Sequence, residues 1–266
     1  MSNLNNKQKT LNALKNKSLV KVISGIQNYD KQKTLKVAMA AELGGATALD
    51  ICDDAEIIKT VRASVQLPLF VSSINPEKLV TAQAYGVDVL EIGNYESFYK
   101  ESRLFTPKEI LEITRKVKGL ISKEVLLCCT IPSTLETETQ IKLAKELFNL
   151  GVDILQTEGF TLETPVSDRD DVVYNDILKA ASTLTNTFRL REALPEANII
   201  TASGITAITS SLAFAMGSSG IGVGNFINSL YDQIEMTEKV KEVMENISRF
   251  NTHLVTEKEK SLVFQN

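Results

Sequence analysis

The sequence lacks the features that define several large classes of protein. None of its 266 residues fall in an apolar run of about 18 or more, the length that a membrane-spanning helix requires. The formal net charge is −4 and the pI is near 5.3, whereas nucleic-acid-binding domains carry a clustered basic surface. We therefore expect neither a membrane nor a nucleic acid as a partner.

Cysteine and histidine are scarce. The three cysteines, Cys52, Cys128 and Cys129, form no C-x-x-C pair, and adjacent residues of a strand point to opposite faces. These features indicate buried, unpaired thiols in a soluble protein of a reducing compartment. The single histidine, His253, lies in a polar segment, 250–266, which we expect to be an exposed C-terminal tail. Acid–base chemistry would therefore fall to carboxylates or to a lysine.

Strand and helix patterns alternate along the whole chain. The patterns predict strands at residues 19–25, 46–51, 67–72, 87–92, 124–130, 152–157, 198–203 and 218–223. They predict helices at residues 34–43, 55–65, 76–85, 107–121, 136–150, 173–193, 205–216 and 226–248. Alternating units of this length favour an α/β fold with a parallel sheet. Eight such units fit a closed (β/α)₈ barrel, the TIM barrel, better than an open doubly wound sheet.

The chain shows no sign of a second domain. No linker rich in Pro, Gly or Ser divides it, and its length is close to the roughly 250 residues of one barrel. Segment 1–18 lacks the apolar region of a secretory signal. Its residues Leu4, Leu11 and Leu14 predict a short N-terminal helix packed on the barrel. We therefore expect residues 1–266 to form a single barrel domain.

A repeat marks the even-numbered strands. Residues 45–51, 86–92, 151–157 and 217–223 align without a gap. The alignment makes Asp50, Glu91, Gln156 and Gly222 equivalent, and alternate strands of a barrel fill the same inner layer. If these positions face inward, two acids and an amide meet near the mouth formed by the carboxyl ends of the strands. We favour this orientation, because facing outward the acids would lie under the helices, where a charge is costly.

The candidate catalytic residues are Lys21, Asp50, Glu91 and Glu158. Asp50 and Glu91 belong to the inner layer. Glu158 lies two residues after Gln156, so its side chain would point to the same side, at the rim of the barrel. Lys21 faces either inward, toward an acid, or outward past the helices. Facing inward, it would pair with Asp50 or Glu91, or act as an amine nucleophile if burial lowers its pKa. A Mg²⁺ site formed by the three acids is a further alternative, although no motif requires a metal.

The ends of the last two strands predict a phosphate site. Each ends in a turn of small residues, 202–204 and 222–225. Phosphate is bound by closely approaching backbone N–H groups at a helix start, and glycine permits that approach. We assign Ser203, Gly204, Gly224 and Asn225 to this site. Alternatively, the glycines at 220, 222 and 224, which share one strand face, only allow close packing of the last strand.

Two long segments, 93–105 and 158–171, would lie over the mouth of the barrel. Long loops at this position are often lids. In the first segment Asn94, Tyr95 and Arg103 are candidate lid residues, and Arg103 is the side chain best suited to reach an anion. The aromatic residues of such a loop more often pack it down than stack on a ligand. No dinucleotide fingerprint or Walker A sequence occurs, so no motif requires a cofactor.

Several motifs in combination resemble a known family. They are KVISG (21–25), GGATALDI (44–51), EIGNY (91–95), SFY (97–99), QTEG (156–159), ASG (202–204) and GVG (222–224). Together, over roughly residues 19–245, the chain resembles the hypothetical chloroplast reading frame family 23. The resemblance implies a barrel of the phosphate-binding superfamily and, for a plastid-encoded member, the plastid stroma. It implies no particular reaction.

The sequence departs from the pattern of that family at two positions. Ser133 follows Pro132 where the resemblance implies Pro-His, and Phe160 stands where it implies a second glycine after Gly159. If the histidine is a catalytic base in relatives, this chain lacks that base. The departures bear on shared catalysis and leave the expected fold unchanged.

Two functions are consistent with these observations. The first is an enzyme that moves a proton next to the carbonyl of a small phosphorylated metabolite, as an isomerase, epimerase or lyase does. Glu91 or Asp50 would be the base, with Lys21 polarising the oxygen or holding the acids ionised, and Glu158 would be the second acid–base group. The alternative is a non-catalytic, regulatory protein that binds a phosphometabolite. The sequence identifies neither the substrate nor a cofactor, and a homodimer is compatible with it although no interface can be recognised.

Overall fold

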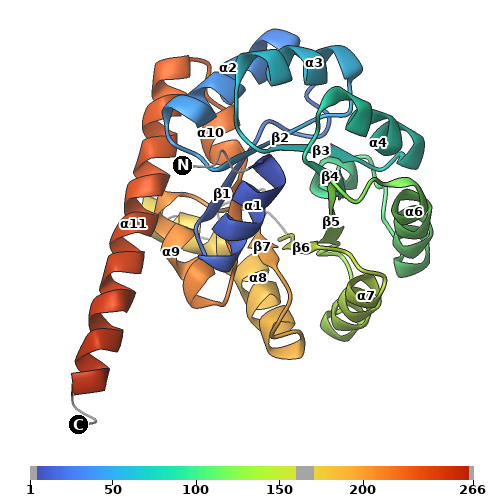
Figure 1. Cartoon of the computed structure of the whole chain (residues 1–266). Coiled ribbons are helices and arrows are strands. Elements are labelled where there is room, and N and C mark those ends of the chain that lie inside the picture. Colours follow the sequence, from blue (N-terminus) through green and yellow to red (C-terminus); the bar gives the residue numbers. More distant parts are fainter. Residues whose placement is uncertain (1–4, 160–170, 264–266) are drawn as a thin grey trace.

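The computed structural model of the chain describes residues 5–159 and 171–263, and the side chains of all of these except 251–263. Eight parallel strands pair in the order of the sequence, and β8 pairs with β1 to close the barrel (Figure 1). This confirms the predicted (β/α)₈ barrel. Most of the expected second lid segment, 158–171, and the departure at Phe160 lie outside the described residues.

All eight predicted strands are present, and their predicted ends are in error by at most two residues. They are β1 (Leu19–Ile23), β2 (Ala48–Ile51), β3 (Leu69–Ser73), β4 (Val89–Ile92), β5 (Leu126–Ile131), β6 (Ile154–Thr157), β7 (Ile199–Thr201) and β8 (Gly220–Val223). The carboxyl ends of all the strands lie at the same edge of the barrel, because every pair is parallel.

The helices form a layer around the strands (Figure 1). This layer contains α2 (Lys31–Leu43), α3 (Ala55–Ser64), α4 (Pro76–Ala82) followed by the 3₁₀ turn η1 (Gln83–Tyr85), α6 (Pro107–Leu120), α7 (Thr137–Asn149), α8 (Val172–Ala193), α9 (Ala207–Ala215) and α11 (Gln233–Val263). Two further short helices, α5 (Glu96–Tyr99) and α10 (Asn225–Asn228), follow β4 and β8 at the mouth.

The predicted helix over 226–248 is wrong in two respects. It is divided into α10 and α11, because the Asp232 carboxylate accepts hydrogen bonds from the backbone N–H groups of Ile234 and Glu235 and so starts a new helix. The second helix then continues to Val263, so most of the segment expected to be a tail, 250–266, is helical. No glycine or proline interrupts residues 233–263, and none therefore ends the helix earlier.

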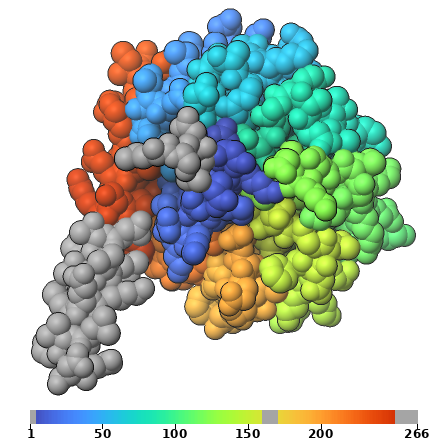
Figure 2. Space-filling model, viewed as in Figure 1, coloured from blue at the N-terminus to red at the C-terminus, as the bar shows by residue number. Residues whose placement is uncertain are grey.

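The apolar core is divided into two parts by the sheet. One part lies between the strands and the helices, and the other fills the inside of the barrel. The inner part includes Phe70, Val89 and Leu14, and Leu14 belongs to α1 (Asn6–Lys15). Figure 2 shows α1 lying over the centre of the barrel at this end. The predicted N-terminal helix therefore closes the barrel at the amino ends of the strands, with Leu11 partly buried beside Leu14.

Candidate active site

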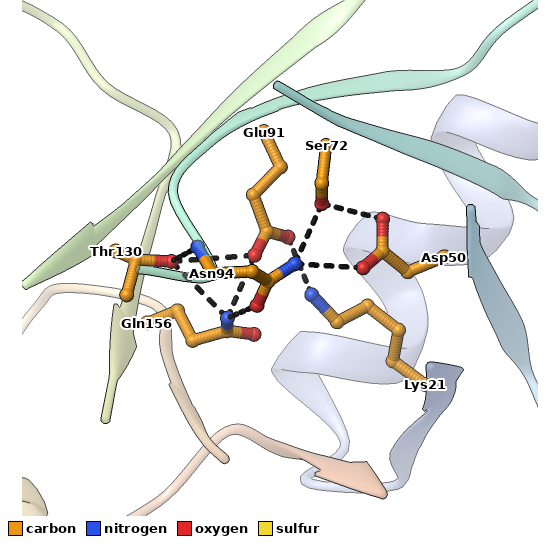
Figure 3. Close-up of polar contacts among 7 residues, drawn as sticks. All are labelled: Lys21, Asp50, Ser72, Glu91, Asn94, Thr130 and Gln156. Atoms are coloured by element: carbon orange, nitrogen blue, oxygen red, sulfur yellow. Dashed lines mark hydrogen bonds and ion pairs between the residues drawn. The ribbon is translucent and has the colours of Figure 1, made fainter. Parts of the chain in front are cut away.

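A layer of polar side chains fills the barrel near the carboxyl ends of the strands (Figure 3). Lys21, Asp50 and Glu91 are 0% exposed and Gln156 is 1% exposed, although all four are polar or charged. Their neighbours along the strands, such as Leu49 and Leu90, belong to the outer core. The two acids and the amide of the repeat therefore face inward, as predicted.

Lys21 faces inward and forms an ion pair with Glu91. Its ammonium group also lies 4.9 Å from the centre of the Phe70 ring. Burial by itself lowers the pKa of Lys21, but the charges of Glu91 and Asp50 outweigh burial, and the net pKa lies above its usual value. An amine nucleophile requires a lowered pKa. This direction therefore argues for an ion pair and against the nucleophile that the sequence left open.

Asp50 is the second acid of the layer and has no direct ion pair with Lys21. Its carboxylate accepts hydrogen bonds from the Ser72 hydroxyl at 2.6 Å and from the Asn94 side-chain amide at 2.8 Å. Burial raises the pKa of Asp50 to about 7. The charge of Glu91 also raises this pKa, whereas the charge of Lys21 lowers it. A buried carboxyl group that gains and loses its proton near neutral pH is suited to acid–base chemistry.

Gln156 and Asn94 connect the two acids. The Gln156 amide nitrogen donates to Glu91 at 2.7 Å and to the Asn94 side-chain oxygen at 2.9 Å, and it lies 3.1 Å from the Thr130 hydroxyl. The amide oxygen of Gln156 is buried and has no hydrogen-bond partner among the described residues. The orientation of this amide is fixed by the acceptors around its nitrogen, so its oxygen must face away from Glu91.

Asn94 crosses the layer because of an unusual local backbone. Gly93 has φ 147° and Asn94 has φ 63°, a left-handed conformation that asparagine tolerates. A side chain at position 93 would collide with Thr130, since an added Cβ would lie 2.3 Å from the Thr130 Cβ. The chain therefore turns sharply after β4 and brings the Asn94 amide into contact with both Asp50 and Ser72.

Glu158 lies at the rim and is only 3% exposed. Its carboxylate accepts hydrogen bonds from the Tyr99 hydroxyl at 2.6 Å and from the backbone N–H groups of Glu96 at 2.5 Å and Ser133 at 3.4 Å. Burial raises the pKa of Glu158 to about 8. Position 133, where the family resemblance implies a histidine, therefore adjoins a candidate acid–base residue.

The turns after β7 and β8 present unpaired backbone donors. Among the residues that the structure describes, the backbone N–H groups of Ser203, Gly204, Gly224 and Asn225 donate no hydrogen bond. We call these four residues the cradle. Ser203 and Gly204 both have positive φ, 72° and 70°, so the chain reverses direction here. The Ser203 hydroxyl donates to the Glu96 carboxylate at 2.7 Å.

The three glycines of the last strand serve different purposes. A Cβ at Gly220 would lie 2.7 Å from the Leu19 Cβ, and one at Gly222 would lie 2.9 Å from both Ala202 and Ile23. These two glycines permit close packing of β8, which is the alternative that the sequence left open. A Cβ at Gly224 would meet nothing closer than 3.8 Å. Only Gly224 of the three has open space above it.

The expected lid segment after β4 is packed down by its aromatic residues. Tyr95 is fully buried, and its ring centre lies 4.3 Å from that of Phe105. Arg103 contacts the Phe105 ring at 4.4 Å and pairs with Glu109, and none of its contacts are to the cradle.

Two residues of the site were missed by sequence reasoning. Ser72 ends the predicted strand 67–72 but was not named as a site residue; its hydroxyl reaches Asp50, whereas the neighbouring Ser73 bonds to Asp53. Ser72 lies two residues after Phe70 on the same strand, so the alternation of side chains along the strand would have identified it as facing inward. Glu96 had no local signal, since its contact with Ser203 joins residues 107 positions apart.

The described residues contain no group of three or more His, Cys, Asp or Glu side chains able to hold a metal ion. The acids that were weighed as Mg²⁺ ligands are instead bonded to protein donors: Glu91 to Lys21, and Asp50 to Ser72. No helix in the described part of the chain is both long and apolar enough to cross a membrane.

Comparison with solved structures supports the barrel fold. The chain is similar to a 3-hexulose-6-phosphate synthase, with a TM-score of 0.58, 13% identity, and coverage of 86% of this chain and 99% of the other. It is also similar to a 4-hydroxy-2-oxoglutarate/2-dehydro-3-deoxyphosphogluconate aldolase, with a TM-score of 0.55, 16% identity, and coverage of 89% and 97%. At such low identity the likeness shows the shared fold alone.

Sequence relatives are much closer. The chain is 41% identical to "Uncharacterized protein ycf23" of Pyropia yezoensis, over 85% of this chain and 81% of the relative. It is 34% identical to the protein of the same name in Cyanidium caldarium, over 90% and 95% of the two chains. Residues 4–253 match the family model described as "Protein of unknown function (DUF561)". The chain therefore belongs to the DUF561 family, together with these ycf23 proteins, as its resemblance to reading frame family 23 predicted.

Proposed function

We propose that the protein is an enzyme that binds a small phosphorylated metabolite at the cradle and transfers a proton next to its carbonyl group. The observation that carries the proposal is the set of four unpaired backbone N–H groups at the adjacent ends of β7 and β8. Phosphate sites of (β/α)₈ barrels are commonly formed at this place, with a short extra helix such as α10 after the last strand.

The polar layer beside the cradle supplies the groups that proton transfer requires. Asp50, with a pKa of about 7, would accept or donate the proton. Lys21, held in its charged form by Glu91, would stabilise negative charge that develops on the carbonyl oxygen. Glu158, with a pKa of about 8, would hold a proton at neutral pH and act as the second acid–base group.

A thermal-shift titration with phosphate and sugar phosphates tests the binding step. A ligand that binds only the folded state raises the melting temperature. We expect Gly224→Asp to abolish the response, because a Cβ fits at this position and the new carboxylate would repel an anion. Gly119→Asp adds the same charge on α6, at a site with no atom within 4 Å, and is expected to respond like the wild type. The absence of any response in the wild type would contradict the proposal.

A second candidate function, phosphometabolite binding without turnover, is favoured by the burial of the polar layer. Asp50 and Glu91 are 0% exposed, and the Asn94 side chain is bonded to Asp50 directly and to Glu91 through Gln156 (Figure 3). Asp50→Asn separates the two functions, since asparagine preserves the side-chain size. For an enzyme, turnover of a bound ester falls at least a hundredfold while its affinity changes little. For a binding protein, the wild type itself shows no turnover.

We infer a location in the plastid for the protein, because its relatives carry the name ycf23 and the family is expected to be plastid-encoded. Cell fractionation of the source organism with an antibody against the protein tests this inference. Detection only outside plastids would contradict it. The proposed partner is the phosphorylated ligand; the homodimer stays a prediction, for which sedimentation of the purified protein is the test.

A further inference from the structure

We propose that the ligand of the cradle is a hydroxyl-rich, uncarboxylated phosphate ester, such as a sugar phosphate or polyol phosphate. This inference rests on the proposed phosphate site and specifies what is attached to the phosphate. It is drawn from the hydrogen-bonding character of the side chains between the cradle and the polar layer. These side chains offer hydrogen-bond acceptors. Such acceptors favour a ligand that carries hydroxyl donors over one that carries a second anionic group.

Glu96 is the first of these acceptors. Its carboxylate is held directly beside the cradle by the Ser203 hydroxyl, at 2.7 Å. The position of Glu96 is fixed at the other end, because its backbone N–H donates to the Glu158 carboxylate. A ligand whose phosphate occupies the cradle therefore has a carboxylate next to its first carbons. A hydroxyl group there gains a charge-assisted hydrogen bond, whereas a carboxylate there is repelled.

Gln156 provides the second and independent observation. Its side-chain oxygen is buried, has no partner among the described residues, and lies 3.6 Å from where a Cβ at Gly222 would be. Gly222 lies in β8, and Gly224 of the cradle follows it two residues later, just beyond the end of the strand. An unpaired buried acceptor is costly. A hydroxyl on the carbon beside the esterified carbon would supply the missing donor.

Three positively charged side chains near the mouth are already paired with protein acids. Lys21 is bound to Glu91, Lys78 to Asp53, and Arg103 to Glu109. A carboxylate on the ligand would have to compete with these protein acids for a cation. The aldolase of similar fold is named for two carboxylic acids, 4-hydroxy-2-oxoglutarate and 2-dehydro-3-deoxyphosphogluconate, whereas the synthase of similar fold is named for a hexulose phosphate. The ligand expected here resembles the hexulose phosphate, because it carries no carboxylate.

Matched pairs of phosphate esters test the inference by calorimetric titration of the full-length protein. Glycerol 3-phosphate is compared with 3-phosphoglycerate, and sorbitol 6-phosphate with 6-phosphogluconate, since the members of each pair are open chains in which a carboxylate replaces a terminal hydroxymethyl group. Inorganic phosphate serves as the reference. We expect the uncarboxylated member of each pair to bind at least tenfold more tightly. Glu96→Gln should narrow that ratio at least threefold, because it removes the repelling charge.

Glu101→Gln is the matched control, since Glu101 is an exposed carboxylate in the same segment as Glu96. It should retain the wild-type ratio, and circular dichroism shows that both variants are folded. Equal or tighter binding of the carboxylated esters, or a ratio unchanged by Glu96→Gln, overturns the inference and leaves the phosphate site standing. If neither phosphate nor any ester binds, the proposed function fails together with the inference.

Discussion

At the scale of single residues, the buried charges of the barrel balance only when a proton is bound. Lys21 carries one positive charge, while Asp50 and Glu91 can carry two negative charges, and all three side chains are 0% exposed. A net buried charge is expensive in a medium of low polarity. Burial raises the pKa of Asp50 to about 7, and the charge of Glu91 also raises it, against the opposing charge of Lys21. Under the proposed function, the same imbalance that destabilises the charged state would prepare Asp50 for proton transfer.

Replacing Lys21 with methionine would leave two acids without a buried cation. Methionine has a similar length and packs well, so the main effect is the loss of the pair with Glu91. We expect the free energy of unfolding, measured with urea, to fall by about 3–5 kcal/mol. The control is Lys59→Met, which removes an exposed ion pair with Glu56. An equal loss of stability in both variants would show that the buried pair has no special role.

The stability of the protein should depend on pH through Asp50. Its pKa is about 7 when folded, against an ordinary value of 3.8, so the folded state binds the proton more tightly than the unfolded state. Stability from this group is complete below about pH 4 and is lost as the pH rises toward 7. Glu158 acts in the same direction up to its folded pKa of about 8.

Asp50→Asn isolates this contribution, because asparagine stays neutral at every pH. Between pH 5 and pH 8 we expect the wild type to lose about 1–3 kcal/mol more stability than the variant. Urea denaturation at each pH measures the difference. Glu112→Gln, a change of an exposed carboxyl group on α6, is expected to follow the wild type. Parallel curves for the wild type and Asp50→Asn would mean that Asp50 is ionised throughout this range.

At the scale of elements, the turns after the last two strands place different demands on their glycines. Gly204 has φ 70°, and a Cβ there would lie 2.5 Å from the Lys179 carbonyl oxygen of α8. Gly45 has φ 84° but no atom within 4 Å of the added Cβ. Gly224 has φ −105° and open space. Substitutions at these three positions therefore distinguish the cost of a left-handed backbone from the cost of steric overlap.

Alanine at these three positions should destabilise the protein to a graded extent. Gly45→Ala should cost about 1–2 kcal/mol for the left-handed backbone. Gly204→Ala should cost about 3 kcal/mol or more, because overlap with α8 adds to that strain. Gly224→Ala should cost less than about 1 kcal/mol. Thermal unfolding of the three variants measures the order, and a Gly224 variant that is the least stable would show that this glycine is required by the fold.

The elements themselves were largely predictable from sequence, because they follow local patterns. The period-2 strands, the helices between them and the shared phase of Asp50, Glu91 and Gln156 all depend on neighbouring residues. The division between α10 and α11 was missed, since it depends on the cap at Asp232. The choice of Glu91 over Asp50 as the partner of Lys21 could not be made, because it depends on side-chain positions across the barrel.

At the scale of the whole molecule, the closed barrel brings together the loops that form the mouth. Glu96 follows β4, Glu158 follows β6 and Ser203 follows β7, and hydrogen bonds join all three. Sequence reasoning placed Glu158 and Ser203 at this mouth because all βα loops share one edge. It did not identify Glu96, since contact between separate loops follows from the closed barrel and not from any local pattern. The cradle, the acceptors around it and the polar layer form one continuous site only in the folded barrel.

The central claim is that the backbone N–H groups of the cradle bind phosphate. The most direct measurement is a titration of the ¹⁵N-labelled protein with inorganic phosphate, followed through its amide signals by TROSY NMR. We expect the amides of Ser203, Gly204, Gly224 and Asn225 to shift and saturate together, while that of Gly119 on α6 stays in place. If these four signals do not move, or if saturable shifts occur only elsewhere, the cradle is not a phosphate site and the account is contradicted.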